Sequence, residues 1–178
     1  MGAFAGPRAR GDAHPVTRPV CAVAGGSSCS REEAAAAREV GRLLAKAGFA
    51  VATGGLGGVM EAASRGAREA GGLVIGILPG TDRSDANPFV DLALPTGLGD
   101  ARNALVAAAG DAMVAVGGSL GTLSEVALAL KRGTPVVGLG TWRLDPARLP
   151  PGGAVIEASS PEEAVRRVVE AVEARRRA

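Results

Sequence analysis

Short apolar runs alternate along the chain with longer stretches in which apolar residues recur every three or four positions. The apolar runs predict seven strands, at 19–24, 49–53, 73–78, 90–94, 111–116, 135–139 and 154–158. The intervening stretches predict helices at about 31–47, 59–70, 101–109, 120–132 and 161–176. Strands that are apolar throughout are typical of a parallel sheet covered on both faces. The pattern therefore predicts an α/β fold, a single doubly wound Rossmann-like domain with a parallel sheet of about seven strands.

Capping signals support these boundaries. Ser30 and Glu33 have the spacing of a capping box at the start of the first helix, and Gly48 can end it. Ser160 followed by Pro161 predicts the start of the last helix. Residues 1–18 are dominated by Gly, Ala, Arg and Pro and predict a disordered N-terminal tail. Residues 19–178 contain neither an internal repeat nor a linker, so they predict one doubly wound α/β domain.

Composition narrows the function classes. The 47% of hydrophobic residues allow a sizeable core, and the 2% of aromatic residues argue against stacking on single-stranded nucleic acid. The net charge of +2 predicts no nucleic-acid partner, because much of the excess sits in arginines near the two ends, at positions 8, 10, 18 and 175–177. No apolar run reaches the ~18 residues of a membrane span, and no signal peptide is apparent. We therefore expect a cytoplasmic protein without a membrane partner.

The reactive side chains exclude several kinds of catalytic centre. The one histidine, His14, lies in the tail, which argues against Ser-His-Asp and Cys-His centres. The His, Cys and Asp residues do not have metal-ligand spacing, so we predict no metal site. Cys21 falls in a core strand and should be buried. Cys29 precedes a helix, where the pKa of a thiol can fall, but we interpret it as a small residue at a helix entrance.

Three Gly-rich turns follow the first, second and fifth predicted strands and should meet at the carboxyl edge of the sheet. Each opens a helix, whose free backbone N–H groups can bind an anion. The second turn lacks the G-x-G-x-x-G spacing, which disfavours NAD, and the P-loop signature of ATPases is missing. The turns predict a phosphate- or ligand-binding site that comprises Gly25, Ser27, Gly54, Gly55, Gly57, Gly58, Gly118, Ser119, Gly121 and Thr122.

Two charged residues stand out beside these turns. Glu125 lies one turn into the helix after the fifth strand, where it would repel a phosphate. It fits better next to a part of the ligand that becomes positive or needs a proton, although it could only balance Arg102. Arg102 opens a helix, where a cation is unfavourable for the helix dipole. It is therefore expected to face an anionic ligand or Glu125; an exposed arginine bridging to Asp100 is the alternative.

These motifs resemble the lonely-guy (LOG) family of lysine-decarboxylase-like Rossmann proteins. Gly118, Gly121, Thr122 and Glu125 match the family motif P-G-G-x-G-T-x-x-E, and Arg102 precedes Glu125 at the family's spacing. The turn at 54–60 resembles the family's G-G-G-x-x-G-L-M turn, and the resemblance covers roughly residues 20–139. LOG enzymes hydrolyse the N-glycosidic bond of nucleoside 5′-monophosphates. The resemblance thus implies catalytic roles for Glu125 and Arg102, no required cofactor, and a homodimer or higher homo-oligomer.

Departures from the motif point to a sister branch. Gly117 replaces the proline, Ser119 the second glycine, and Asn103 the lysine that follows the arginine in active LOG enzymes. The segment 96–99 and the flanks of the motif look closer to the branch that includes the molybdenum cofactor carrier protein, which binds a phosphorylated pterin. Two functions remain open: a phosphoribohydrolase, favoured because Arg102 and Glu125 persist, or a non-catalytic carrier or sensor that binds molybdenum cofactor or a related phosphorylated heterocycle.

Overall fold

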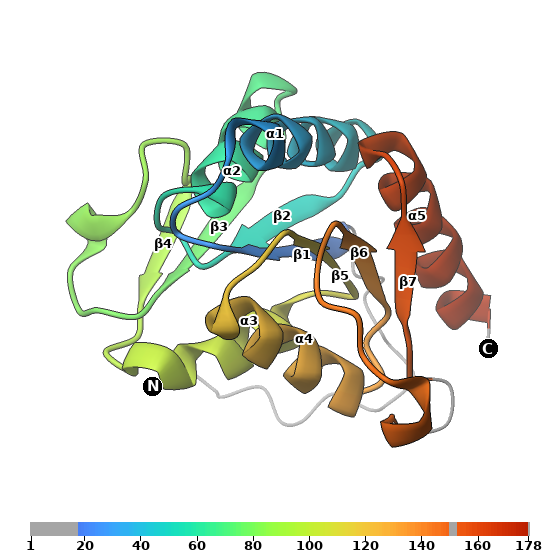
Figure 1. Ribbon diagram of the computed structural model, residues 1–178. Coiled ribbons are helices and arrows are strands. Elements are labelled where there is room, and N and C mark those ends of the chain that lie inside the picture. The colour runs from blue at the N-terminus through green and yellow to red at the C-terminus, as the bar shows by residue number, and fades with distance from the viewer. Residues whose placement is uncertain (1–17, 150–152, 178) are drawn as a thin grey trace, which may run out of the picture.

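The computed structural model describes residues 18–149 and 153–177, which form one seven-stranded parallel sheet (Figure 1). The sheet order is β4-β3-β2-β1-β5-β6-β7. This confirms the predicted fold. Of the predicted tail, only Arg18 lies within the described residues. The strand bounds are β1 Val20–Gly25, β2 Ala50–Thr53, β3 Val74–Leu78, β4 Leu92–Pro95, β5 Ala112–Val116, β6 Val136–Leu139 and β7 Val155–Ala158.

Five α-helices cover the two faces of the sheet (Figure 1). Alternate residues of β1 point to opposite faces: Cys21 and Val23 belong to the core beneath α1, α2 and α5, and Ala22 and Ala24 to the core above α3 and α4. Cys21 is fully buried, as predicted. The helix bounds are α1 Arg31–Lys46, α2 Val59–Glu69, α3 Asn103–Ala109, α4 Leu120–Lys131 and α5 Pro161–Arg177.

Side-chain caps fix the helix starts that the sequence predicted. Ser30 Oγ accepts a hydrogen bond from Glu33 N at 3.1 Å, and Glu33 Oε2 accepts one from Ser30 N at 2.8 Å. This confirms the capping box at the start of α1. Ser160 Oγ likewise accepts a hydrogen bond from Glu163 N at 3.2 Å at the start of α5.

Strand β4 differs from the prediction. It runs from Leu92 to Pro95 and not from 90 to 94, and Leu92 and Leu94 are 48% and 41% exposed. The expectation of coverage on both faces is therefore wrong for this strand. The reason is its position at the edge of the sheet: α3 packs mainly on β1 and β2 and leaves the β4 leucines partly exposed.

The predicted helix at 101–109 begins differently as well. A 3₁₀ turn, η2 (Gly99–Arg102), leads into α3. The turn is tied back to the end of β3, because Gly97 N donates to Gly80 O and Gly99 N donates to Pro79 O, at 2.9 and 3.0 Å. These bonds hold the segment in a tighter path than an α-helix, and they bring Arg102 over the carboxyl edge of the sheet.

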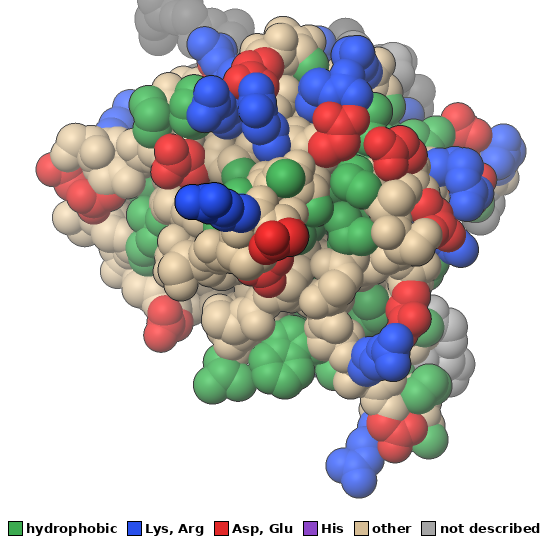
Figure 2. All heavy atoms as spheres, turned by 45° about the horizontal axis from the view of Figure 1, so that its top comes forward, with side chains coloured by type: hydrophobic (Ala, Val, Ile, Leu, Met, Phe, Trp, Pro, Cys, Tyr) green, Lys and Arg blue, Asp and Glu red, His purple; other side chains and the backbone are tan. Residues whose placement is uncertain are grey.

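Positive and negative side chains alternate over the face that α1, α2 and α5 present to solvent (Figure 2). Several form ion pairs between or within helices, such as Arg38 with Glu69 and Arg166 with Glu170. Mixed charge of this kind offers no continuous track for a polyanion. None of the helices in the described part of the chain is long and apolar enough to cross a membrane.

Candidate functional site

The candidate site lies where the order of the strands reverses. The chain proceeds from β1 outward to β4 and then returns with β5 on the other side of β1. Ligands of doubly wound sheets bind at such a switch point, outside the carboxyl ends of the strands. A cleft of about 230 Å³ opens there, lined by Gly25, Ser27, Leu56, Met60, Pro79, Asp100, Arg102, Asn103, Ser119, Gly121, Thr122 and Glu125.

The start of α4 forms one end of the cleft. The chain enters the helix through Gly117 and Gly118, whose φ angles of +56° and +135° are rarely adopted by other residues. Ser119 is the N-cap, and its backbone N–H donates to Thr122 Oγ1 at 3.3 Å. The first backbone bond of the helix runs from Leu123 N to Ser119 O. The preceding amides thus lack a backbone acceptor within the helix and can form an anion-binding end.

Arg102 and Glu125 meet beneath this end. Their side chains are only 9% and 7% exposed, and Arg102 Nη1 lies 3.7 Å from Glu125 Oε1. This confirms that Arg102 faces Glu125; the alternative of an exposed arginine is wrong. The contact is an ion pair but is longer than a direct hydrogen bond. Arg102 Nε is also buried and has no hydrogen-bond partner among residues 18–149 and 153–177.

Gly54 makes room for the arginine. A Cβ atom at this position would stand 2.1 Å from Arg102 Nη1 and 2.6 Å from Met60 Sδ. The guanidinium group therefore packs directly against the backbone after β2. Only a residue without a side chain leaves this space for the guanidinium group.

Burial governs the charge state of the pair. It raises the pKa of the Glu125 carboxyl to about 7, and Arg102 opposes this only in part. Burial also lowers the pKa of the Arg102 guanidinium, against the opposing effects of Glu125 and Asp100. Near neutral pH part of the carboxyl population is therefore protonated, and the buried arginine then lacks a fully charged partner. An anionic ligand would supply that charge.

We expect a pH-dependent stability difference between the wild type and Glu125→Gln. Because the carboxyl's pKa is higher in the folded protein than its ordinary value of 4.5, its stabilising contribution is full below pH 4.5 and is lost as the pH rises through 7. Glutamine does not titrate, so the variant should gain stability relative to the wild type by about 3 kcal/mol between pH 4.5 and 8. Urea unfolding of both proteins across this range measures the difference. A constant difference would contradict the raised pKa.

The other walls come from residues that the sequence analysis did not assign to the site. Leu56, Met60 and Pro79 supply apolar surface, and Asp100 supplies a second carboxylate. Asn103, noted only as a departure from the family motif, also lines the cleft. Its Nδ2 donates to Ser124 Oγ at 2.8 Å and so ties α3 to α4.

The predicted ligand-binding residues divide into two groups. Gly25, Ser27, Ser119, Gly121 and Thr122 line the cleft together with Arg102 and Glu125. The remaining glycines lie beside the cleft and not in its lining: Gly54, Gly55, Gly57, Gly58 and Gly118. The second turn is held by contacts within the protein: Gly55 N donates to Thr53 Oγ1, and Val59 N donates to Gly26 O of the first turn, both at 3.0 Å.

Cys29 is not an activated thiol. It is partly exposed, and burial together with the nearby Glu33 carboxylate raises the pKa of its thiol. Burial is the larger of the two causes, and the raised pKa agrees with the interpretation of Cys29 as a small residue at a helix entrance. Within the described ranges, no three His, Cys, Asp or Glu residues lie close enough together to hold a metal ion.

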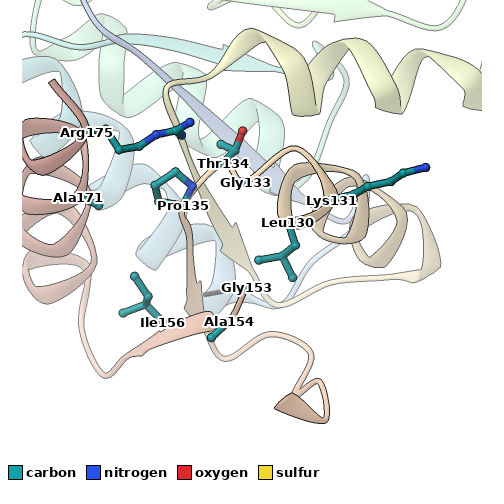
Figure 3. A pocket seen from close by; sticks show the side chains of 10 residues that line it. All are labelled: Leu130, Lys131, Gly133, Thr134, Pro135, Gly153, Ala154, Ile156, Ala171 and Arg175. Carbon is teal, nitrogen blue, oxygen red and sulfur yellow. The ribbon is translucent and has the colours of Figure 1, made fainter. Parts of the chain in front are cut away.

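A larger hollow, about 510 Å³, lies at the opposite edge of the sheet (Figure 3). Its walls are mainly apolar, with Leu130, Pro135 and Ile156 among them, and Arg175 reaches across it toward Thr134 while Lys131 points away. It lies at the amino ends of the strands and lacks a group of converging polar side chains. The cleft at the carboxyl edge is therefore the better candidate.

Comparison with known proteins identifies the family of the chain. The sequence profile of the SLOG cluster4 family matches residues 18–165. A protein of Archaeoglobus fulgidus is 43% identical over 143 residues, which are 80% of this chain and 89% of the relative. Two solved structures are also similar over nearly their whole length.

The first is the molybdenum cofactor binding protein of the phototrophic bacterium Rippkaea orientalis, with a TM-score of 0.80 and 39% identity over 87% of this chain and 98% of that chain. The second is the molybdenum cofactor carrier protein of Chlamydomonas reinhardtii, with a TM-score of 0.77 and 36% identity over 88% of this chain and 99% of that chain.

Proposed function

Because the chain belongs to the SLOG cluster4 family, we propose that it binds a phosphorylated heterocycle at the carboxyl-edge cleft and carries the molybdenum cofactor without chemical change. The family match confirms the resemblance that the motifs indicated. The carrier reading is now preferred over the phosphoribohydrolase, because two similar structures are of proteins that carry or bind this cofactor.

One observation carries the proposal: Arg102 is buried, incompletely paired, and part of the lining of a cleft that ends at the N-terminus of α4. A buried cation with a free N–H group calls for an anion, and a phosphate also fits the free amides of α4. Thr122 and Ser27 add hydroxyl groups to this end. These residues fit the phosphorylated pterin part of the cofactor.

The remaining walls fit the rest of such a ligand. Leu56, Met60 and Pro79 offer apolar contact to a flat ring. The cleft volume of about 230 Å³ is below the ~300–1,000 Å³ of sites that enclose a drug-sized ligand. A ligand is therefore held partly in the open, which suits a carrier that must hand its cargo on.

The second candidate function is hydrolysis of nucleoside 5′-monophosphates, and Glu125 favours it. A carboxyl whose pKa lies near 7 can give or take a proton at neutral pH. Its place beside Arg102 and below the anion-binding end would bring it near the sugar of a bound nucleotide. This reading requires turnover that depends on Glu125.

Equilibrium binding and product analysis separate the two functions. Purified protein is titrated with molybdenum cofactor and, separately, incubated with AMP, GMP and CMP while free base is followed by chromatography. A carrier is expected to bind the cofactor saturably and to release no base. Base release by the wild type but not by Glu125→Gln would establish the hydrolase instead. Absence of binding and of turnover would contradict both.

We also propose that the protein is a homodimer. The outer faces of the adjacent helices α3 and α4 are apolar, with Leu105 41% and Leu120 74% exposed. Burial of such leucines in a partner would favour association. Sedimentation equilibrium should give a dimer for the wild type and a monomer for Leu105→Glu. Leu73→Glu, at an exposed leucine before β3, is the control and should remain dimeric.

A further inference from the structure

The lining of the cleft changes in chemical character along the edge of the sheet. Hydroxyl groups and free amides lie at the end formed by β1 and β5, which are neighbours in the sheet. Apolar side chains follow at the ends of β2 and β3. Asp100 lies beyond them, placed next to Pro79 by the 3.0 Å bond from Gly99 N to Pro79 O. The cleft thus leads from an anion-binding end over apolar walls to a carboxylate.

The separation between the two ends suits a mononucleotide or a pterin phosphate. Three strand intervals, from β3 through β2 and β1 to β5, lie between Pro79 and the start of α4. At about 4.8 Å per interval, this amounts to roughly 14 Å. A phosphate at α4 would therefore place an attached heterocycle over the apolar walls, with its outer edge toward Asp100.

Asp100 lies near enough to Arg102 to oppose the lowering of the guanidinium's pKa by burial, but within the described residues no hydrogen bond or ion pair holds its carboxylate. Its carboxylate is exposed in the lining, whereas Glu125 is buried. Within residues 18–149 and 153–177, Asp100 forms no ion pair within 4.0 Å, and the 3₁₀ turn η2 has no side-chain cap. A carboxylate available at the end of a ring-sized cleft can accept hydrogen bonds only, so it selects for N–H groups.

We infer that the Asp100 carboxylate accepts hydrogen bonds from the N–H edge of a 2-amino-4-oxo heterocycle, the edge that pterins and guanine share. This inference rests on the proposed function and names the class of ligand that the site prefers. The ring N–H and the amino group of such an edge lie side by side, so that both can donate to one carboxylate. Adenine presents an unprotonated ring nitrogen at the equivalent place, and its lone pair would face the carboxylate.

GMP, IMP and AMP test the inference, because they share the phosphate and ribose and differ at this edge. Their dissociation constants are measured by isothermal titration calorimetry with the full chain. We expect GMP to bind about ten-fold more tightly than AMP, with IMP between them because it keeps the ring N–H and lacks the amino group. Asp100→Asn should weaken the binding of GMP and leave the binding of AMP unchanged or slightly tighter. The dissociation constants of GMP and AMP should then agree to within about two-fold.

Asp85→Asn is the matched control, since it removes an exposed carboxylate outside the cleft lining and should leave the ratio at its wild-type value. The ratio of the GMP and AMP dissociation constants separates recognition of the base from a general loss of binding. A structural defect would weaken the binding of all three nucleotides together. Equal affinities in the wild type, or a ratio that survives in Asp100→Asn, would overturn the inference and leave the proposed function intact. If neither the nucleotides nor the cofactor bind, both are overturned.

Discussion

Replacing Arg102 with methionine is expected to lower the affinity for GMP or the cofactor by about two orders of magnitude. The side chain lines the cleft, and its buried Nε lacks a partner within the part of the chain that the structure describes. Loss of a buried charge that faces an anion costs about 2–5 kcal/mol, and a hundred-fold change corresponds to about 2.7 kcal/mol. Methionine keeps most of the packing volume against Gly54. Calorimetric titration measures the change.

Two further variants distinguish recognition from folding. Arg102→Lys keeps the charge but not the planar fork, so it should retain part of the affinity. Arg83→Met removes an exposed arginine from the loop after β3 and should bind as the wild type does. If Arg102→Met folds, by circular dichroism, and binds with unchanged affinity, the anion is not held by this arginine and the proposed site is wrong.

The sequence predicted the fold well because the signals involved are local. Apolar runs and caps such as Ser30 with Glu33 depend on residues a few positions apart. The exposure of β4 could not be predicted in the same way. Its leucines resemble those of a central strand, and only the arrangement of the whole sheet places them at an edge that α3 does not cover.

The candidate site was predictable in part for a similar reason. The turn before α4 and the spacing of Arg102 and Glu125 are patterns in the sequence, and the two side chains do meet. Gly54 illustrates the part of the site that could not be predicted. It was expected to contact ligand, but a Cβ at this position would first meet Arg102, 48 positions away in the chain. Leu56, Met60 and Pro79 were missed because apolar residues near turns look like ordinary core.

Gly66→Ala is expected to give the largest loss of stability, about 3 kcal/mol, which lowers the melting temperature by roughly 6–12 °C. Helices α1 and α2 approach backbone to backbone: a Cβ at Gly66 would lie 1.8 Å from Arg38 O, and one at Gly41 would lie 2.0 Å from Ala63 O. A backbone carbonyl cannot turn aside as a side chain can, so the helices must separate.

The same replacement at Gly121, in the first turn of α4, is the matched control. Its Cβ would lie 3.6 Å from Ser119 Oγ, an ordinary contact, and alanine favours a helix over glycine by up to about 1 kcal/mol. Thermal unfolding should therefore show Gly121→Ala at or slightly above the wild-type melting temperature and Gly66→Ala well below it. Because Gly66 is not part of the cleft lining, the folded fraction of Gly66→Ala should still bind GMP normally at low temperature. Equal melting temperatures for the two variants would mean that α1 and α2 do not rely on this backbone contact.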